Sequence, residues 1–291
     1  MGVAVEFDVV VVGSCNLDLV STTSHLPSPG ETLRAIEYAE HAGGKGLNQA
    51  VACARMGART AFIGCVGNDS AGNMLRDLLI SEGVDISQLT TVDAPTGRAF
   101  ITVETSGENT IVIVAGANAY VGKTAITVPR SRVVLAQLEI PLDVVLDVFT
   151  QARKQGAMTV LNPAPAETLS TDLLSLCDIA VPNETECAAL GGTHALLHAG
   201  VSTVITTLGE HDAEISDGTI TTAVASHSVT PVDTVGAGDA FVGALCSEIA
   251  RGASIHEAAK VASIAGALAT TVRGAVPSLP VRATVMSYYA D

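Results

Sequence analysis

The sequence contains no tryptophan, and aromatic residues make up only 3% of its 291 residues. The core must therefore be packed mainly by Val, Ala, Leu and Ile, and the 48% of hydrophobic residues provides enough material for it. A chain of this length suits one large α/β domain that carries a small subdomain, or two small domains.

Basic residues are also scarce. The chain has 15 Lys and Arg residues against 30 Asp and Glu residues, which gives a net charge of −15. Nucleic-acid backbones and anionic membrane surfaces repel such a chain, so we expect neither as a partner. To bind a nucleotide, the protein would have to gather local positive potential from backbone amides, a lysine or a metal ion.

Long apolar runs are missing as well. The longest uncharged stretch of helical character, VASIAGALATTV at 261–272, is well short of the about 20 residues that span a bilayer. The N-terminal segment has no basic flank and contains Glu6 and Asp8, so it predicts a first strand and not a signal peptide. We therefore expect a soluble, cytoplasmic protein.

The cysteines show no Cys-x-x-Cys spacing. This excludes the usual zinc and disulfide frameworks and predicts small buried thiols in a reducing compartment. The six residues are Cys15, Cys53, Cys65, Cys177, Cys187 and Cys246.

Alternating strands and helices organise most of the chain. FDVVVVG at 7–13 is a continuous apolar run, which is typical of a strand covered on both faces. Further strands are predicted at 60–67, 133–139 and 157–162, and helices at 46–57, 70–83, 141–156, 237–252 and 255–272. This order predicts a mostly parallel sheet with helices on both faces. Segment 97–116 instead alternates as a β-hairpin, and with 15–42 it could form a small separate sheet.

Ligands of open α/β sheets bind beyond the carboxyl ends of the strands. Polar residues follow the predicted strands at these ends, namely Asn16, Asp18, Glu139, Asn162 and Asn183. We expect the functional site at this edge of the sheet.

The stretch ANAYVGKT at 117–124 imitates a phosphate-binding P-loop. The motif requires glycine where Ala117 stands, and a helix should follow Thr124, but the chain continues with β-branched residues and Pro129. We therefore interpret the stretch as the end of the hairpin, with Lys123 and Thr124 in a connecting loop.

DTVGAGDAFVGAL at 233–245 is a better phosphate site. The glycines of GAGD allow a sharp turn into an apolar helix, whose positive end can bind an anion. Asp239 in the first turn could take a proton from a hydroxyl that attacks a phosphoryl group. Taken alone, the pattern is equally compatible with an ordinary helix start.

Two further clusters add to this one. GGKGLNQA at 43–50 is a second glycine-rich turn into a helix, with Lys45 and Asn48, although a tight turn with a solvated lysine would look the same. In NETE at 183–186, Asn183 and Glu186 share a helix face and could hold hydrated Mg²⁺, or they could simply begin an acidic helix.

GGKGLNQA and DTVGAGDAF together resemble the two signature regions of the PfkB carbohydrate-kinase family, and specifically its ribokinase group. The similarity runs along nearly the whole chain, because further motifs occur in the family's order and at similar spacing. They are GSCNLDL, PSPGET, PTGRAFITVETSGENTIVIVAGAN, QLEIP, LNPAPA, PNETE, TTLG and GAVPS.

The resemblance implies a single ribokinase-like domain over 1–291, in which a Rossmann-like α/β sheet carries a β-sheet lid formed by 15–42 and 97–116. It implies ATP-dependent phosphorylation of the 5-hydroxyl of D-ribose, with Mg²⁺ and K⁺, and a homodimer formed through the lid. A related kinase acting on a nucleoside, deoxyribose or another sugar is the alternative, and a catalytically silent binding protein is a third possibility.

The resemblance also assigns roles to residues. Asp239 would be the base, and the amides of Gly236, Ala237 and Gly238 would form the anion hole. The sugar would be held by Asn16, Asp18, Gly43, Gly44, Lys45, Asn48 and Glu139. Asn183 and Glu186 would organise Mg²⁺ through water, and ATP would contact Asn183, Thr207, Gly209 and Ser263. A monovalent cation would be bound by Asp233, Val235, Thr270, Gly274 and Ser278.

Three positions depart from the family pattern. Asp212 replaces a usual glycine, which puts nucleotide affinity in doubt, and Ser263 stands where His or Asn is frequent beside the adenine. Leu47 replaces the usual alanine behind the sugar. His194 and His198 are four residues apart but lack the glutamate of a zinc protease, so we interpret them as helix-surface residues.

Overall fold

The computed structural model describes residues 5–289, so residues 1–4 and 290–291 of the predicted 1–291 domain lie outside the described part. The strands are β1 Phe7–Val12, β2 Asn16–Thr23, β3 Glu37–Gly43, β4 Thr60–Gly67, β5 Asp85–Val92, β6 Gly97–Glu104, β7 Asn109–Val114, β8 Ser131–Ala136, β9 Met158–Leu161, β10 Ile179–Ala180, β11 Thr203–Thr206, β12 Ala213–Ser216 and β13 Thr221–Val224. The helices are α1 Lys45–Arg55, α2 Ser70–Ser81, η1 Gly116–Tyr120 (a 3₁₀ helix), α3 Leu142–Gln155, α4 Thr171–Ser175, α5 Glu184–Ala189, α6 Gly192–His198, α7 Ala237–Ala250, α8 Ile255–Ala269, α9 Ala275–Ser278 and α10 Arg282–Tyr289.

The central sheet has nine strands in the order β13-β12-β11-β10-β9-β8-β1-β4-β5. Its strands pair in parallel from β5 to β11, and only β12 and β13 add antiparallel pairs at one edge. The predicted mostly parallel sheet is therefore confirmed. The strand β5 was not predicted, because only Leu89 of its eight residues is buried and no clear alternation marks it.

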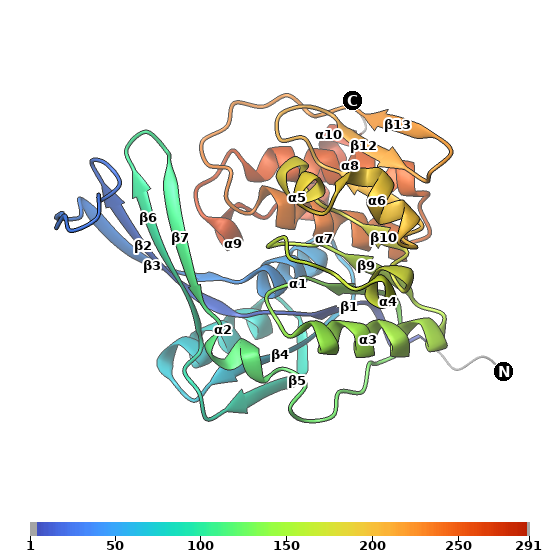
Figure 1. Ribbon diagram of the computed structural model, residues 1–291, viewed down its shortest axis with the longest axis horizontal. Coiled ribbons are helices and arrows are strands. Elements are labelled where there is room, and N and C mark those ends of the chain that lie inside the picture. Colours follow the sequence, from blue (N-terminus) through green and yellow to red (C-terminus); the bar gives the residue numbers. More distant parts are fainter. Residues whose placement is uncertain (1–4, 290–291) are drawn as a thin grey trace.

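Helices cover both faces of this sheet, and alternate side chains of β1 supply both cores. Val9 and Val11 pack on the face of α1, α7 and α8, whereas Val10 and Val12 pack on the face of α3. Figure 1 shows these two layers of helices around the central strands. The uninterrupted valines are explained by this double coverage, since both faces of β1 are removed from water.

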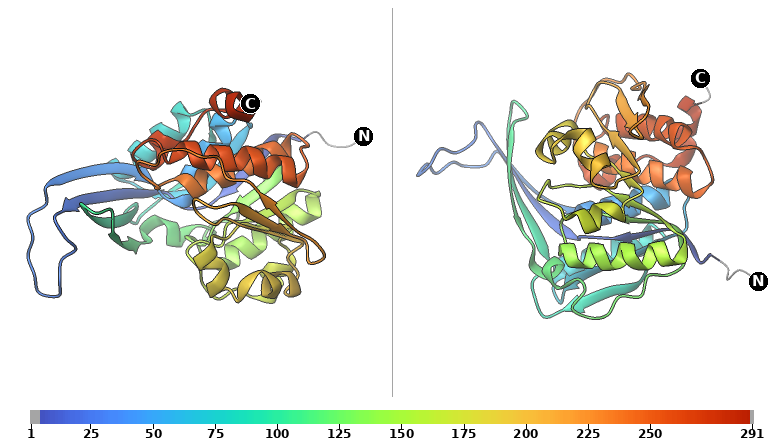
Figure 2. Two further views of the ribbon diagram at one scale, coloured as in Figure 1. Left: turned by 90° about the horizontal axis from the view of Figure 1, so that it is seen from above. Right: turned by 45° about the vertical axis from the view of Figure 1, so that its right-hand side comes forward.

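A second sheet of four strands, in the order β3-β2-β6-β7, projects from one side of the main body (Figures 1 and 2). β2 and β6 pair in parallel, and β3 and β7 pair antiparallel to them at the two edges. Its strands come from the two segments that we assigned to a lid. That this sheet covers a bound substrate stays a prediction.

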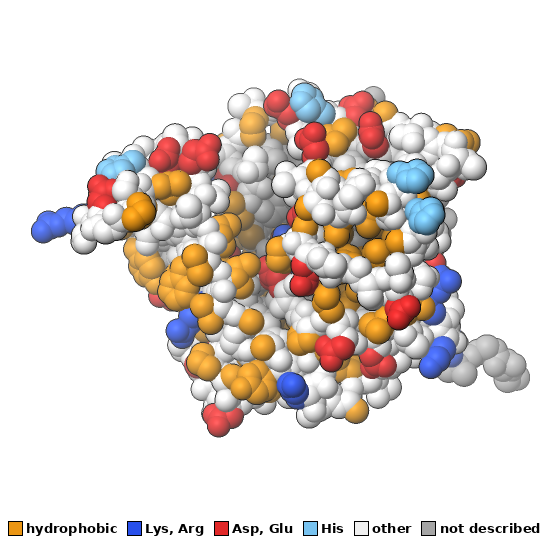
Figure 3. Space-filling model, in the orientation of Figure 1, with side chains coloured by type: hydrophobic (Ala, Val, Ile, Leu, Met, Phe, Trp, Pro, Cys, Tyr) orange, Lys and Arg blue, Asp and Glu red, His pale blue; other side chains and the backbone are white. Residues whose placement is uncertain are grey.

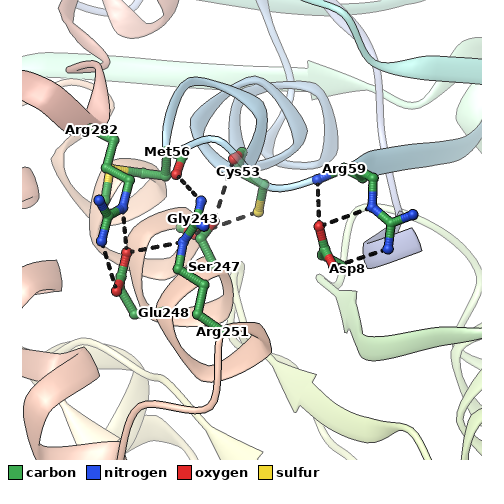
Figure 4. Close-up of polar contacts among 9 residues, drawn as sticks. All are labelled: Asp8, Cys53, Met56, Arg59, Gly243, Ser247, Glu248, Arg251 and Arg282. Carbon is green, nitrogen blue, oxygen red and sulfur yellow. Dashed lines mark hydrogen bonds and ion pairs between the residues drawn. The ribbon is translucent and has the colours of Figure 1, made fainter. Parts of the chain in front are cut away.

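The two helices that begin after a glycine turn, α1 and α7, pack closely against each other. A Cβ atom on Gly243 would lie 2.4 Å from the Ala52 Cβ, so only glycine allows this approach. Ser247 Oγ donates to the Gly243 and Cys53 carbonyls, and Arg251 Nη2 donates to the Met56 carbonyl (Figure 4). The ends of the site helices are thus fixed to each other.

Charged residues tie the C-terminal helix to this pair. Glu248 on α7 accepts from Arg282 Nε at 2.9 Å and forms an ion pair with Arg251 (Figure 4). On the other side of α1, Arg59 pairs with Asp8 at the start of β1. These contacts fix the positions of α1 and α7 at the ends remote from the turns that begin them.

All six cysteines are buried free thiols, as predicted. Burial raises the pKa of the Cys53 and Cys177 thiols to about 12, so both stay protonated. His194 and His198 stack on the exposed surface of α6, which confirms their interpretation as surface residues. Within residues 5–289, no helix is long and apolar enough to cross a membrane.

Candidate active site

The start of α7 is a sharp glycine turn. Gly236 precedes the helix with a φ of 84°, a conformation that favours glycine, and a Cβ there would lie only 3.0 Å from the Ala275 Cα. Within the described part of the chain, the N–H groups of Gly236 and Gly238 donate no hydrogen bond. These amides and the positive end of the helix can therefore bind an anion.

The start of α1 is a second such turn. Gly44 has a φ of 91°, and a Cβ there would lie 2.8 Å from the Asn16 amide nitrogen. At Gly46, a Cβ would lie 2.4 Å from the Ser14 amide nitrogen. The glycines thus let the start of α1 lie directly on the backbone between β1 and β2.

Asp239 joins the two helix starts. Its Oδ2 accepts a hydrogen bond from Asn48 Nδ2 and its Oδ1 accepts one from Gln49 Nε2, both at 2.9 Å. The residue is 9% exposed, so its carboxylate is held firmly but still reaches an open space. That space is a cavity of about 240 Å³.

The cavity brings several predicted site residues together. It is lined by Lys45, Asn162, Val181, Asn183, Glu186, Thr207, Thr234, Gly236, Gly238, Asp239 and Val242. Figure 3 shows the surface hollowed between the second sheet and the helical main body. Seven of these residues were assigned to the sugar, phosphate, nucleotide or Mg²⁺ from the sequence, and they come from four separate segments of the chain.

Glu139 is the centre of a second polar group, at the base of the second sheet. Its Oε2 accepts hydrogen bonds from Ser14 Oγ at 2.5 Å, Lys45 N at 3.2 Å and Asn16 Nδ2 at 3.4 Å. The carboxylate therefore has a fixed position beside the start of α1. Ser14 was not predicted, because an isolated serine after a strand carries no signal of its own.

Asp18 lies close to this group on β2. A Cβ on Gly43 would lie 2.1 Å from Asp18 Oδ2, so the carboxyl group needs the glycine opposite it. Burial, together with the negative charges of Glu139 and Asp239, raises the Asp18 pKa from 3.8 to about 7. Three carboxyl groups thus face one region of the site.

Asn118 completes this group, although we expected it only to close the hairpin. Its Oδ1 accepts from Cys15 N at 2.9 Å, and its Nδ2 donates to Cys15 O at 3.2 Å and to Asn16 Oδ1 at 2.7 Å. It lies in η1, so the stretch that imitates a P-loop forms a 3₁₀ helix and a turn, and no α-helix follows before α3. Because Asn16 Oδ1 accepts the hydrogen bond from Asn118 Nδ2, the Asn16 amide nitrogen must face Glu139.

Asn183 and Glu186 form a capping box at the start of α5. Asn183 Oδ1 accepts from Glu186 N at 2.7 Å, and Glu186 Oε2 accepts from Asn183 N at 2.9 Å. Of the two alternatives that we gave for these residues, an acidic helix start is therefore present. Both residues nevertheless line the cavity, and Glu186 Oε1 forms no hydrogen bond with a described residue.

The segment predicted to bind the nucleotide follows β11. Thr207 pairs with Asn183 as a parallel bridge and lines the cavity, whereas Gly209 and Ser263 lie outside it. Ser263 Oγ donates to the Ala225 carbonyl at 3.0 Å. All positive-φ residues among 5–289 are glycines, so Asp212 occupies its turn without the left-handed conformation that a glycine there could adopt.

Asp233 organises the loop predicted to bind a monovalent cation. Its Oδ2 accepts from Gly274 N at 2.8 Å and its Oδ1 from Val235 N at 3.0 Å, and its own N–H donates to the Thr270 carbonyl. Ser278 approaches from the other side, because a Cβ on Gly236 would lie 3.2 Å from Ser278 Oγ. The five residues predicted to bind the cation thus lie around the turn that begins α7.

Leu47 is fully buried in the core beneath the first turn of α1. Two glutamines escaped sequence analysis altogether. Gln49 contacts Asp239, and Gln137 Nε2 donates to Gln49 Oε1 at 2.6 Å. Nothing in the local pattern distinguishes either residue, since their partners lie far away in the sequence.

Comparison with known proteins agrees with this geometry. The model of the pfkB family carbohydrate kinases matches residues 6–282. The chain is 38% identical to the ribokinase of Haemophilus influenzae over 96% of this chain and 97% of that protein. It is 32% identical to the deoxyribokinase of Salmonella typhi, over 94% and 95% of the two chains.

Solved structures give the same result. The crystal structure of the ribokinase from Thermotoga maritima matches with a TM-score of 0.91 and 34% identity, over 98% of this chain and all of that one. The ribokinase of Arabidopsis thaliana complexed with ribose and ATP matches with a TM-score of 0.86 and 31% identity, over 96% and 97%. The predicted resemblance is confirmed, and the chain belongs to the pfkB family of carbohydrate kinases.

Proposed function

We propose that this protein transfers the γ-phosphoryl group of ATP to the 5-hydroxyl of D-ribose. The observation that carries the proposal is Asp239, whose carboxylate is fixed by Asn48 and Gln49 beside free amides at the start of α7. A base next to an anion-binding turn is the arrangement that phosphoryl transfer to a hydroxyl requires. The names and bound ligands of the ribokinase relatives support ribose and ATP as the substrates.

The sugar is held by the polar group at the base of the second sheet. A pentose presents several hydroxyls, and fixed donors and acceptors are needed to distinguish them from water. Carboxylates at Asp18 and Glu139 accept hydrogen bonds from hydroxyls, and the amides of Asn16 and Asn48 offer both donors and acceptors. Lys45 and the backbone of Gly43 and Gly44 complete the set. Asn48 Oδ1 is buried without a partner among the described residues, and a sugar hydroxyl would satisfy it.

Asp239 takes the proton from the attacking hydroxyl, and Asn48 brings sugar and base together because its Nδ2 donates to Asp239. The free amides of Gly236 and Gly238 stabilise the charge that develops on the transferred phosphoryl group. The Ala237 N–H, which we also assigned to the anion hole, donates to the Thr234 carbonyl at 3.3 Å and would have to exchange this weak bond for the phosphoryl oxygen. ATP lies along the cavity side of Asn183 and Thr207, with its base toward Gly209 and Ser263 in our assignment.

The residues near α5 fit Mg²⁺ bound through water. Among residues 5–289 no group of three or more His, Cys, Asp or Glu could hold a metal directly. Mg²⁺, however, needs only one or two carboxylates when phosphates and water supply its other ligands. Glu186 Oε1 and the Asn183 side chain line the cavity and provide this weak anchor. The ion would neutralise phosphate charge.

The loop of Asp233 fits a monovalent cation such as K⁺, because all its candidate ligands are oxygens. They come from Asp233, Val235, Thr270, Gly274 and Ser278. The Thr270 carbonyl already accepts two N–H groups, so it is the weakest of them. A bound cation would hold the loop behind Gly236 and thereby support the anion hole.

We also propose that a second copy of the chain covers the second sheet. The edge strand β7 exposes all its residues, and Ile111, Val112 and Val114 are 54%, 64% and 50% exposed. An exposed apolar edge strand needs a partner, and a symmetric dimer provides one. Val112→Lys should convert a dimer of twice 29.5 kDa into a monomer in light scattering, whereas Ile220→Lys, equally exposed elsewhere, should not. A dimeric Val112→Lys variant would contradict this interface.

An ADP-release assay over a substrate panel tests the function. The panel contains D-ribose, 2-deoxyribose, fructose and adenosine, each with K⁺ or Na⁺. We expect the highest kcat/KM with ribose and a higher rate with K⁺. A large preference for adenosine or deoxyribose would show that the protein is the related kinase and not a ribose kinase. If none of the panel compounds supports ADP release, the protein is not a kinase of this type.

A further inference from the structure

Gln49 uses every hydrogen-bonding atom of its side chain. Its Nε2 donates to Asp239 Oδ1 and to Asn162 Oδ1, both at 2.9 Å, and its Oε1 accepts from Gln137 Nε2 at 2.6 Å. The residue is 0% exposed and does not line the cavity. Its contacts therefore serve Asp239 and not a ligand.

Chemistry fixes the orientation of this amide. An ionised carboxylate only accepts hydrogen bonds, so the Gln49 atom that faces Asp239 must be the nitrogen. The remaining oxygen then needs a donor, which Gln137 supplies. A reversed amide would set an oxygen against the Asp239 carboxylate and a nitrogen against the Gln137 nitrogen. Gln49 therefore has one stable arrangement.

The partners of Gln49 connect it to the rigid sheet. Gln137 directly follows β8, and Asn162 directly follows β9 and donates its Nδ2 to the Val181 carbonyl at 2.8 Å. Gln137 lies directly against Gly13, the residue after β1, since a Cβ on Gly13 would lie 2.1 Å from Gln137 Oε1. The orientation of Asp239 is thus set by the ends of two central strands.

We propose that Gln49 is a positioning residue for phosphoryl transfer, which fixes the Asp239 carboxylate with an N–H donor and aims its free lone pair at the attacking hydroxyl. The proposal rests on the proposed function, because it assumes that Asp239 is the base. Asn48 Nδ2 occupies one lone pair of Oδ2 and Gln49 Nε2 one of Oδ1. An N–H donor to a carboxylate favours its charged form, which is the form that accepts a proton.

Several charged groups share the surroundings of Asp239. Lys45 and Glu186 line the same cavity, and Asp18 and Glu139 stand on the sugar side, where the charge of Asp239 acts on Asp18. Asp239 thus lies among three carboxyl groups and one lysine, and Gln49 supplies it with a neutral hydrogen-bond donor.

Two variants test this role. In Gln49→Glu an oxygen replaces the donor, so two carboxyl groups share one site and one proton is held more tightly. We expect the acidic limb of the kcat/KM profile for ribose to move to higher pH by about one pH unit or more. In Gln49→Leu we expect kcat to fall roughly 10- to 100-fold, the worth of one hydrogen bond to a charged group. Ribose affinity in calorimetry should stay within about twofold for both variants.

Gln155 provides matched controls. It is a half-buried glutamine on α3, away from the cavity, and its Nε2 donates to the Val128 carbonyl at 2.9 Å. Gln155→Glu and Gln155→Leu should lower the melting temperature without moving the acidic limb. If the Gln49 variants only lower the melting temperature as these controls do, Gln49 has a structural role and the proposal is wrong.

A second readout does not depend on activity. Carbon-13 NMR of labelled aspartates follows the Asp239 carboxyl, whose pKa should be higher in Gln49→Glu than in the wild type. An unchanged Asp239 titration overturns the proposal even if the kinase is active. Wild-type protein that releases no ADP with any sugar instead overturns the proposed function, while the titration still decides whether Gln49 controls Asp239.

Discussion

Asp18→Asn is expected to stabilise the protein above neutral pH. Burial and the nearby Glu139 and Asp239 raise the Asp18 pKa from 3.8 to about 7, so the folded state disfavours the charged form. Below about pH 4 the carboxyl is protonated in the folded and the unfolded chain, and no penalty exists. As the pH rises to about 7, only the unfolded chain gains by ionising, and folding stability is lost.

The size of this effect follows from the pKa. A rise from 3.8 to about 7 corresponds to about 4 kcal/mol, at 1.36 kcal/mol for each tenfold change in the ionisation constant. Asp18 is half-buried, and solvent screening reduces the value to about 2–4 kcal/mol. The unfolding entropy of 291 residues is about 0.6 kcal/mol/K, so the melting temperature should rise by about 3–6 °C.

Thermal unfolding of both proteins between pH 4 and pH 8 measures this difference. The gain in Asp18→Asn should be largest at pH 8 and vanish toward pH 4. Asp217→Asn is a control of opposite sign, because hydrogen bonds from Thr219 and Ile220 lower the Asp217 pKa to about 2, and its loss should destabilise at pH 8. A melting temperature of Asp18→Asn equal to or below the wild type at pH 8 would refute the reasoning. It would mean that burial and the neighbouring carboxylates do not disfavour the charged form of Asp18 in the folded protein.

Three further changes have distinct expected results. Asn118→Ala frees the Asn16 amide and leaves Cys15 without its side-chain partner, so ribose KM should rise about tenfold and the melting temperature fall, as kinetics and thermal unfolding would show. Gly243→Ala places a Cβ 2.4 Å from that of Ala52 and should cost about 1–3 kcal/mol of unfolding free energy in denaturant titration, with unchanged KM. Asp239→Asn should lower kcat by at least about 100-fold while calorimetry still detects ribose binding; persistent turnover would rule out Asp239 as the base.

Much of the main domain could be predicted because its signals are local. The valines of β1 and the glycine turns at Gly44 and Gly236 are visible within a few residues, and each element formed where expected. The strand β5 was missed because it lies at an edge and buries only Leu89. A half-exposed edge strand needs no apolar pattern, so a single sequence does not show it.

The support of the site could not be predicted in the same way. In the sequence, Gln49 is indistinguishable from an ordinary helix residue. Only the fold brings it to Asp239, which lies 190 positions away. Asn118 belongs to a stretch that imitates a phosphate loop, and its partner Asn16 is 102 positions distant. Sequence patterns indicate which residues carry reactive groups, whereas the residues that orient them are defined by long-range contacts.

Product analysis of the wild-type reaction tests the central claim most directly. The protein is incubated with D-ribose, ATP, Mg²⁺ and K⁺, and the position of the new phosphate is read by two-dimensional phosphorus–proton NMR. Our account predicts one product, in which phosphorus couples to the protons on carbon 5 of ribose. The absence of a sugar phosphate, or a phosphate on any other hydroxyl, would contradict it.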